Sequence, residues 1–184
     1  MIMARATADD VDTLLAWRHQ RRAELEAQGS DQWSIAMPRA EFAATVASGQ
    51  TWVARDGDEP AGTITLSAWS EVNALWRPPS ERGTPLWYPQ DRPNDALYFA
   101  RMIVPRSRAG QGLGREMMAW AGGRAYDAGL IWLRCDAWTT NHQLHRYYLE
   151  RGFSHVRTLN TLLSGACFQR VAQPYTGRLK TEGD

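Results

Sequence analysis

The sequence has little of what marks membrane, secreted and metal-binding proteins. Its 184 residues include two cysteines, Cys135 and Cys167, which form no C-x-x-C pair and have no metal-ligand spacing to histidines. We therefore expect reduced, buried thiols and no metal site. No apolar run approaches the length of a membrane span, and the charged residues 1–12 lack the apolar core of a signal peptide. These absences predict a cytoplasmic protein with no membrane partner.

The chain also lacks an excess of charge of one sign. Its 21 basic and 20 acidic residues give a formal net charge of +1, so there is no overall basic field to attract phosphates. This balance counts against nucleic acid as a partner and leaves a homodimer open. The length and the ordinary apolar content of 43% predict a single folded domain over residues 1–184.

Two helices and a hairpin are predicted in the N-terminal half. Apolar spacing predicts one amphipathic helix at 9–28, and a proline at the start and a glycine past the end bound a second at 38–48. We expect this helical pair to precede any strand. Residues 51–69 form two β-rich runs around the turn formers DGDEP. Five prolines then predict a long loop at 76–95, either functional or an irregular surface excursion.

The C-terminal half alternates strands with helices. The predicted elements are a strand at 97–104, a helix at 112–128, a strand at 130–138, a helix between Asn141 and Gly152, and strands at 153–159 and 166–172. This order is typical of a layered α/β domain.

The most informative segment is VPRSRAGQGLGR at 104–115, where a predicted strand leads through alternating glycines into a helix. Glycines allow the backbone to approach a ligand, and the first amides of a helix favour an anion. Four arginines (101, 106, 108 and 115) lie in a window, 96–115, that contains no Asp or Glu. The segment therefore predicts a phosphate-binding loop. The structural alternative is a glycine-rich turn that only connects strand to helix.

Two common phosphate-binding motifs do not fit this segment. A P-loop needs Lys followed by Ser or Thr after its last glycine, and Arg115-Glu116 stand there. A dinucleotide-binding fingerprint needs Gly or Ala where Arg115 or Met117 stands, depending on its start.

The segment resembles the cofactor loop of the GNAT superfamily of acetyltransferases. Gly112 and Gly114 match the family's glycines, whereas Ala109 stands where the family has Arg or Gln, with Arg108 next to it. The strand before the loop, the strand LRCDAW and the helix NHQLHRYYLERGF extend the resemblance over residues 97–159. It implies a mixed, mostly antiparallel sheet flanked by helices, with a central strand pair that splays apart. It also implies acetyl-CoA as cofactor and a small-molecule amine as acceptor, which attacks directly in a ternary complex.

The resemblance also implies a set of cofactor-binding residues. Met102, Ile103 and Val104 would pair with the pantetheine arm along the first strand of the splayed pair. The pyrophosphate would bind to the loop, which comprises Arg108, Ala109, Gly110, Gln111, Gly112, Leu113, Gly114 and Arg115.

Two side chains of the helix after Asn141 match family positions. Tyr148, four residues before Gly152, matches the tyrosine that faces the sulfur of coenzyme A, and we expect it to be the general acid. Its neighbour Tyr147 points about 100° away around a helix and is expected in the core. Asn141 matches an asparagine that contacts pantetheine, with a helix N-cap as the equal alternative.

The sequence leaves the group that deprotonates the acceptor open. Asp136, near the end of the second splayed strand, is one candidate, with a purely structural strand-end role equally favoured. Glu71 and Arg101 are further polar neighbours, and a water chain serves as well. The histidines 142, 145 and 155 have no partners for a metal and are expected at the surface.

Tryptophan is the one residue type in excess, with nine copies. Trp33, Trp76 and Trp87 fall in irregular segments and are predicted to line the acceptor pocket, which suits a partly apolar acceptor or a cation over an indole face. Two other functions remain as alternatives: a non-catalytic module that senses coenzyme A, against which Tyr148 argues, and a toxin that acetylates charged tRNA, which would need a basic surface.

Overall fold

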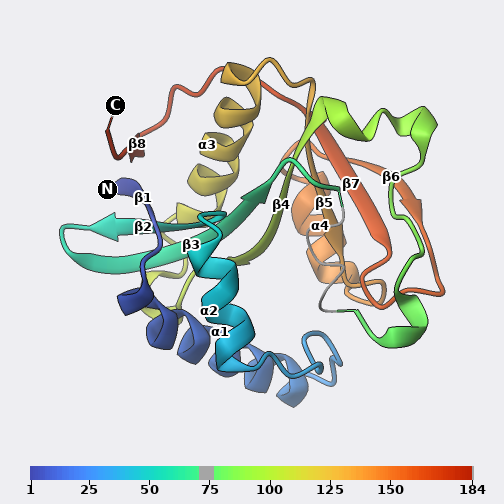
Figure 1. Ribbon diagram of the computed structural model, residues 1–184, viewed down its shortest axis with the longest axis horizontal. Coiled ribbons are helices and arrows are strands. Elements are labelled where there is room, and N and C mark those ends of the chain that lie inside the picture. The colour runs from blue at the N-terminus through green and yellow to red at the C-terminus, as the bar shows by residue number, and fades with distance from the viewer. Residues whose placement is uncertain (71–76, 184) are drawn as a thin grey trace.

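The chain folds around one mixed sheet in a computed structural model that describes residues 1–70 and 77–183 (Figure 1). Within these residues the 8-stranded sheet has the order β6-β7-β5-β4-β3-β2-β1-β8, and β4–β5 and β1–β8 are parallel pairs in an otherwise antiparallel sheet. The strands are β1 (Ile2–Arg5), β2 (Thr51–Asp56), β3 (Glu59–Ser67), β4 (Ala96–Ile103), β5 (Trp132–Ala137), β6 (Ser154–Thr158), β7 (Ala166–Val171) and β8 (Lys180–Thr181). The helices are α1 (Val11–Ala27), α2 (Arg39–Ala47), α3 (Leu113–Asp127) and α4 (His142–Leu149). The predicted fold class is confirmed.

The expectation that the helical pair precedes any strand is wrong. Residues Ile2–Arg5 form β1, which pairs with β2 in the register Met3↔Ala54 and with β8 on its other side. Four residues carry too little periodicity to identify a strand from sequence. Their state is decided by pairing, which buries Met3 completely.

The helices α1 and α2 lie where the sequence predicts them. Pro38 immediately precedes α2, and Gly49 follows it with a φ of +72°. Leu14 of α1 and Val46 of α2 pack with Val53 of β2 in one apolar cluster. The two helices therefore cover one face of the sheet, opposite α3 (Figure 1).

The alternation of side chains along β2 separates the two faces. Val53 points to α1 and α2, whereas its neighbours Trp52 and Ala54 belong to the cluster that contains Met117 and Met118 of α3. This second cluster is the main core and continues to β5, β7 and α4.

The described part of the proline-rich segment is packed rather than a free surface excursion. Trp87 is buried and its ring meets that of Tyr98 edge-on, with 5.8 Å between centroids. Both carboxylate oxygens of Asp91 accept hydrogen bonds of 2.6 Å from Arg157 of β6. Short 3-10 turns form at Pro79–Glu81, Pro89–Asp91 and Pro93–Asp95. The segment thus lies on the same face of the sheet as α1 and α2. The two helices cover this face over β2, and the segment covers it on the side of β4 and β7.

The central parallel pair, β4 and β5, separates after three residue pairs. Pairing runs from Ala96↔Trp132 to Tyr98↔Arg134, although β4 continues to Ile103 and β5 to Ala137. On its other edge β4 bulges against β3 at Arg101, which has a φ of +51°. A bulge bends its strand, which is consistent with the divergence of β4 from β5. The second half of β4 therefore has one edge without ladder pairs in the described chain.

Candidate active site

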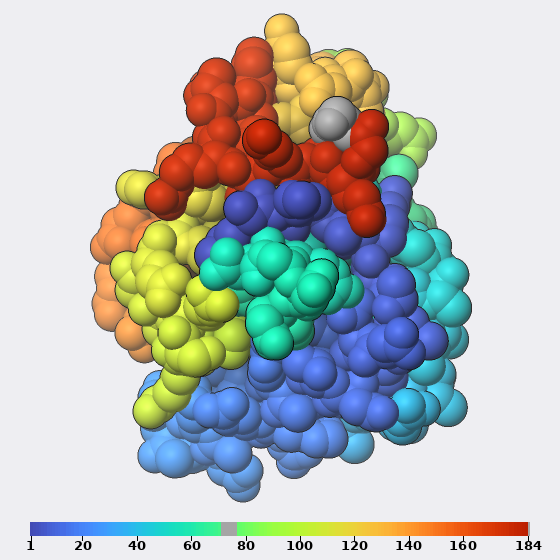
Figure 2. All heavy atoms as spheres, turned by 90° about the vertical axis from the view of Figure 1, so that its left-hand side faces the viewer, coloured from blue at the N-terminus to red at the C-terminus, as the bar shows by residue number. Residues whose placement is uncertain are grey.

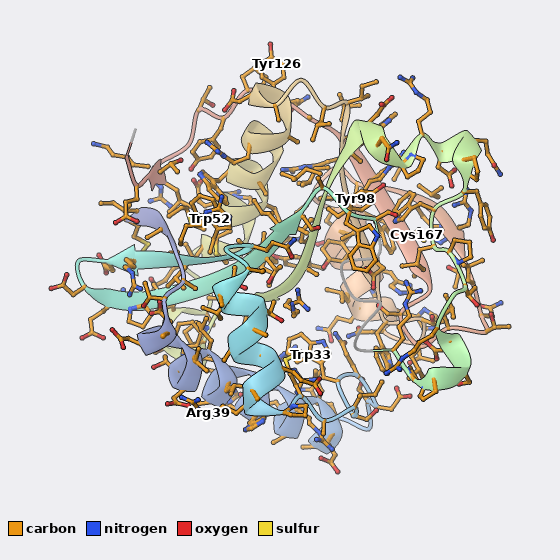
Figure 3. All side chains as sticks on the ribbon, viewed as in Figure 1. Trp33, Arg39, Trp52, Tyr98, Tyr126 and Cys167 are labelled. Carbon is orange, nitrogen blue, oxygen red and sulfur yellow. The ribbon has the colours of Figure 1, made fainter. Side chains whose placement is uncertain are left out.

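A cavity of about 390 Å³ lies where β4 and β5 separate. Its walls come from α1, residues 32–37 and 77–81, the second half of β4, the end of β5 and the helix α4. Trp33 lies beside this cavity, in the segment that joins α1 to α2 (Figure 3). Segments from both halves of the chain thus enclose a space of the size that small ligands occupy.

The glycine loop opens directly into α3, as predicted. Gly110 and Gly112 have φ values of +76° and +78°, a left-handed conformation that glycine adopts without steric cost. Gly112 is the residue that precedes α3, so the amides of Leu113, Gly114 and Arg115 are in the first turn and lack intrahelical acceptors. The loop presents donors and the positive end of a helix dipole.

Two arginines of this loop already have carboxylate partners. Arg106 pairs with Glu24 of α1 at 2.7 Å, and Arg108 pairs with Asp56 at 2.8 Å. Figure 2 shows the loop on the surface beside α1 and the β2–β3 turn. The predicted excess of positive charge is therefore partly neutralised. Arg115 extends over the glycine turn, with its guanidinium 4.0 Å from the position of a Cβ on Gly112.

The splayed strand and the loop meet at Gly114. A Cβ atom built there would lie 2.9 Å from the Tyr147 hydroxyl and 3.7 Å from side-chain atoms of Met102 and Val104. All four residues line the cavity, together with Ile103. The predicted pantetheine edge and the start of the predicted pyrophosphate helix thus share one wall.

Tyr148 lies deep in this site. Its ring packs against Phe99, Phe153 and Phe168, with centroids 5.9, 5.5 and 5.5 Å away, and the residue also lines the cavity. Burial raises the pKa of its hydroxyl well above the ordinary value, and the neighbouring Cys135 and Asp136 add to the shift. The hydroxyl therefore stays protonated at neutral pH.

Tyr147 is not simply a core residue as expected. It is half-buried, lines the cavity and carries the Arg151 guanidinium 3.5 Å from its ring centroid. Both neighbouring tyrosines consequently reach the site, one beside Gly114 and the other among the phenylalanines.

Asn141 caps the helix α4 and lines the cavity at the same time. Its side-chain oxygen accepts a hydrogen bond of 2.9 Å from the Leu144 amide, and its amide group donates one of 2.5 Å to Gln32. The structural alternative for Asn141 is thus observed. The bond to Gln32 also joins α4 to the segment after α1.

Asp136 and Arg101 face the cavity from β5 and β4. The hydroxyl of Ser164 donates a hydrogen bond of 2.5 Å to Asp136. Arg101 donates from Nε to the hydroxyl of Thr65 at 3.3 Å. Burial lowers the pKa of Arg101 to about 10, while Asp136 opposes this shift and Arg18 adds to it. Arg101 therefore remains a cation at neutral pH.

Several residues of the site belong to no motif in the sequence. Arg18 lies on the buried face of α1 and lines the cavity, as do Gln32 and Ser164. The one available signal was an arginine at an apolar position of an amphipathic helix, since arginine is rarely buried without a partner.

The three tryptophans predicted for the acceptor pocket have different outcomes. Trp33 lines the cavity. Trp87 does not, because it is buried in the cluster of Leu86, Tyr98 and Cys167, so its placement at the pocket is corrected. Trp76 lies outside the described residues, as does Glu71.

Both cysteines are free and buried, as predicted. Within residues 1–70 and 77–183, no three or more His, Cys, Asp or Glu side chains gather in a way that could hold a metal ion. The expectation of three surface histidines needs a correction at His145, which is half-buried and hydrogen-bonds to the Trp138 carbonyl at 2.9 Å. In the described chain, no helix has the length and apolar character needed to cross a membrane.

Comparison with known proteins identifies similar sequences. Residues 14–153 match the model of the acetyltransferase (GNAT) family. The uncharacterized N-acetyltransferase YesJ of Bacillus subtilis is 24% identical over 151 residues, which span 80% of this chain and 78% of that protein.

Solved structures share the fold. An acetyltransferase of the GNAT family from Listeria monocytogenes has a TM-score of 0.67 at 17% identity, with 92% of this chain and 94% of that chain covered. The structure of yncA from Salmonella typhimurium with its cofactor acetyl-CoA has a TM-score of 0.60 at 13% identity, with 97% of each chain covered.

Proposed function

Since the chain belongs to the GNAT family of acetyltransferases, we propose that it transfers an acetyl group from acetyl-CoA to the amine of a small acceptor that binds in the cavity between β4 and β5. The observation that carries this proposal is the common wall of the site. One cavity is lined by the free edge of β4, by the first turn of α3 and by Tyr148. Donor, acceptor and proton donor would therefore meet in one place.

The residues present fit acetyl-CoA as the acetyl donor. The left-handed glycines 110 and 112 let the backbone approach a pyrophosphate, and the first-turn amides of α3 would bind it together with Arg115. Arg108 would hold the loop to the β2–β3 turn through Asp56 rather than act as a free phosphate ligand.

The second half of β4 suits a pantetheine arm. Its edge toward β5 has no ladder pairs in the described chain, so the backbone of Met102, Ile103 and Val104 is available to an extended ligand. Gly114 keeps this path open, because a side chain there would fill the space beside the Tyr147 hydroxyl. Asn141 would contribute mainly by fixing the start of α4.

When bound, acetyl-CoA supplies a thioester whose carbonyl carbon reacts with an amine and whose sulfur leaves. Tyr148 would donate its proton to that sulfur as the carbon–sulfur bond breaks, because the raised pKa of its hydroxyl keeps the proton available at neutral pH. The surrounding phenylalanine rings hold the hydroxyl in a dry environment.

Asp136 would serve the acceptor. Its carboxylate lines the cavity, accepts a hydrogen bond from Ser164, and would orient the acceptor ammonium and take up its proton before the nitrogen attacks. An amine is mostly protonated in water near pH 7, so this step precedes bond formation.

Thiol release from acetyl-CoA in the presence of amine pools tests the proposed function. We expect release that depends on amine and on protein, with N-acetylated products detected by mass spectrometry. The enzyme's own Cys135 and Cys167 are buried and will contribute little background. If the protein binds acetyl-CoA but releases no thiol when amino acids, polyamines, aminoglycosides or peptides are offered as acceptors, the result would instead indicate a sensor.

A further inference from the structure

Two guanidinium groups meet at one wall of the cavity. Arg18 comes from α1 and Arg101 from the bulge of β4, and both residues line the cavity. They lie close enough for the charge of Arg18 to lower the pKa of Arg101. Arg18 donates one hydrogen bond of 2.9 Å, to the Ile35 carbonyl, and Arg101 donates one of 3.3 Å, to Thr65.

Each of these arginines has a buried nitrogen without a partner. The Nη1 atoms of Arg18 and Arg101 are inaccessible to solvent and make no hydrogen bond, and neither residue forms an ion pair within residues 1–70 and 77–183. Arg18 as a whole is only 7% exposed. By contrast, Arg106 and Arg108 of the nearby loop both pair with carboxylates.

Such an arrangement is costly for the folded protein. Buried guanidinium groups lose hydration, and two like charges side by side repel each other. An anion bound at this wall of the cavity would offset the repulsion between the two cations, and a carboxylate matches the fork of a guanidinium with two parallel hydrogen bonds.

An opposite charge lies in the same cavity. Asp136 of β5 attracts Arg101 and is oriented by Ser164. The walls of the cavity also include the apolar side chains of Ile35 and Phe99. This distribution suits a small molecule that carries an anion at one end and an amine at the other.

We propose that the acceptor is an amine that also carries a carboxylate, such as a free amino acid, and that Arg18 and Arg101 bind this carboxylate while Asp136 receives the amine. The inference rests on the proposed acetyl transfer and adds the class of acceptor. Arg18 and Arg101 are then the residues that determine specificity, because they distinguish an amino acid from a simple amine.

Matched acceptor sets test the proposal. Each set contains an amino acid, its carboxamide, its decarboxylated amine and its aminophosphonate, built on alanine, leucine and phenylalanine. With wild-type protein we expect kcat/KM for the free carboxylate to exceed that for the amide and the simple amine by at least about a hundredfold, the result of losing two charge-assisted contacts. Equal rates for the amide or the simple amine, or a preference for the phosphonate, would overturn the proposal.

Variants connect the preference to the two arginines. Arg18→Met and Arg101→Met should each raise the KM of the amino acid by about tenfold or more and reduce its advantage over the amide. Arg101→Lys should restore part of the preference, since it keeps the charge. Arg82→Met, which removes an exposed arginine outside the cavity, should change neither quantity.

A binding measurement separates this inference from the proposed function. Calorimetry on protein saturated with coenzyme A should show N-acetyl-leucine binding at least about tenfold tighter than its amide, with the difference lost in Arg101→Met. Equal affinities refute the carboxylate site even if amines are acetylated. A clear carboxylate preference without thiol release from any amine refutes the acetyl transfer and leaves the anion site standing.

Discussion

Replacement of Tyr148 by phenylalanine should remove the proton donor of the reaction and leave the fold intact. The substitution deletes one hydroxyl and keeps the ring that packs against Phe99, Phe153 and Phe168. Tyr147→Phe is the matched comparison, because the same atom is removed one residue away, beside Gly114.

The two variants should differ in which kinetic constant changes and in the size of the change. Loss of general acid catalysis lowers turnover by about a hundredfold or more, which corresponds to about 2.7 kcal/mol in the activation barrier. For Tyr148→Phe we therefore expect a drop of this size in kcat with acetyl-CoA affinity within about threefold of wild type. Tyr147→Phe should act mainly on the KM of acetyl-CoA, since its hydroxyl touches the cofactor wall rather than the buried ring cluster.

Steady-state thiol release at saturating acceptor, calorimetry with acetyl-CoA and thermal melts measure these three quantities. Because the pKa of Tyr148 is raised, wild-type kcat should show no loss on the alkaline side below about pH 10, the ordinary pKa of tyrosine. The assignment fails if Tyr148→Phe keeps full turnover, or if Tyr147→Phe alone reproduces the hundredfold loss. A melting temperature more than a few degrees lower for Tyr148→Phe would point to a packing role instead.

The remaining predictions concern the loop, the tryptophans and the buried thiols. Gly112→Ala should weaken acetyl-CoA binding by at least about tenfold in calorimetry. Gly129→Ala strains the same left-handed conformation at the other end of α3 and should lower only stability, by about 1 kcal/mol. Equal affinities in the two variants would contradict the loop assignment. Trp87→Ala should cost about 3–5 kcal/mol of unfolding free energy by chemical denaturation, while Trp33→Ala should raise the acceptor KM with a smaller loss of stability, and the reverse pattern would contradict their placement. Burial raises the pKa of the Cys167 thiol to about 12, so the folded state keeps a proton that the unfolded chain loses above about pH 8.5. The free energy of unfolding should therefore fall by up to about 1.4 kcal/mol per pH unit through this group as pH rises from 8.5 toward 12. Cys167→Ala should reduce this pH dependence in denaturant titrations. An unchanged pH dependence would argue that the thiol does not stay protonated.

The backbone path of the glycine loop was largely predictable because its signals are local. Alternating glycines between a strand and a helix specify a backbone path, and that path appears at Gly110, Gly112 and the start of α3. The order of elements indicated a layered α/β domain, and the resemblance of residues 97–159 to the GNAT family implied the mixed sheet with its splayed strand pair. The strand β1 was not predicted because four residues are too few to show a periodic pattern, and their conformation depends on pairing with β2.

Long-range packing corrected several side-chain expectations. Trp33 and Trp87 both fall in irregular segments, but one lines the cavity and the other fills an apolar cluster. From the sequence, Arg108 is expected to bind phosphate, but the fold brings Asp56, far away in the sequence, into an ion pair with it. Spacing along the chain says nothing about such partners.

The sequence by itself determined the backbone features of the proposed cofactor loop, since the conformation of a glycine loop and the dipole of the helix after it depend on adjacent residues. Only the tertiary structure decided the acceptor end. Arg18 on α1 and Arg101 on β4 are separated by most of the first half of the chain, and their buried, unpaired nitrogens exist only because the sheet and α1 close over them. Burial without a partner is a property of the packed molecule, and no local pattern encodes it.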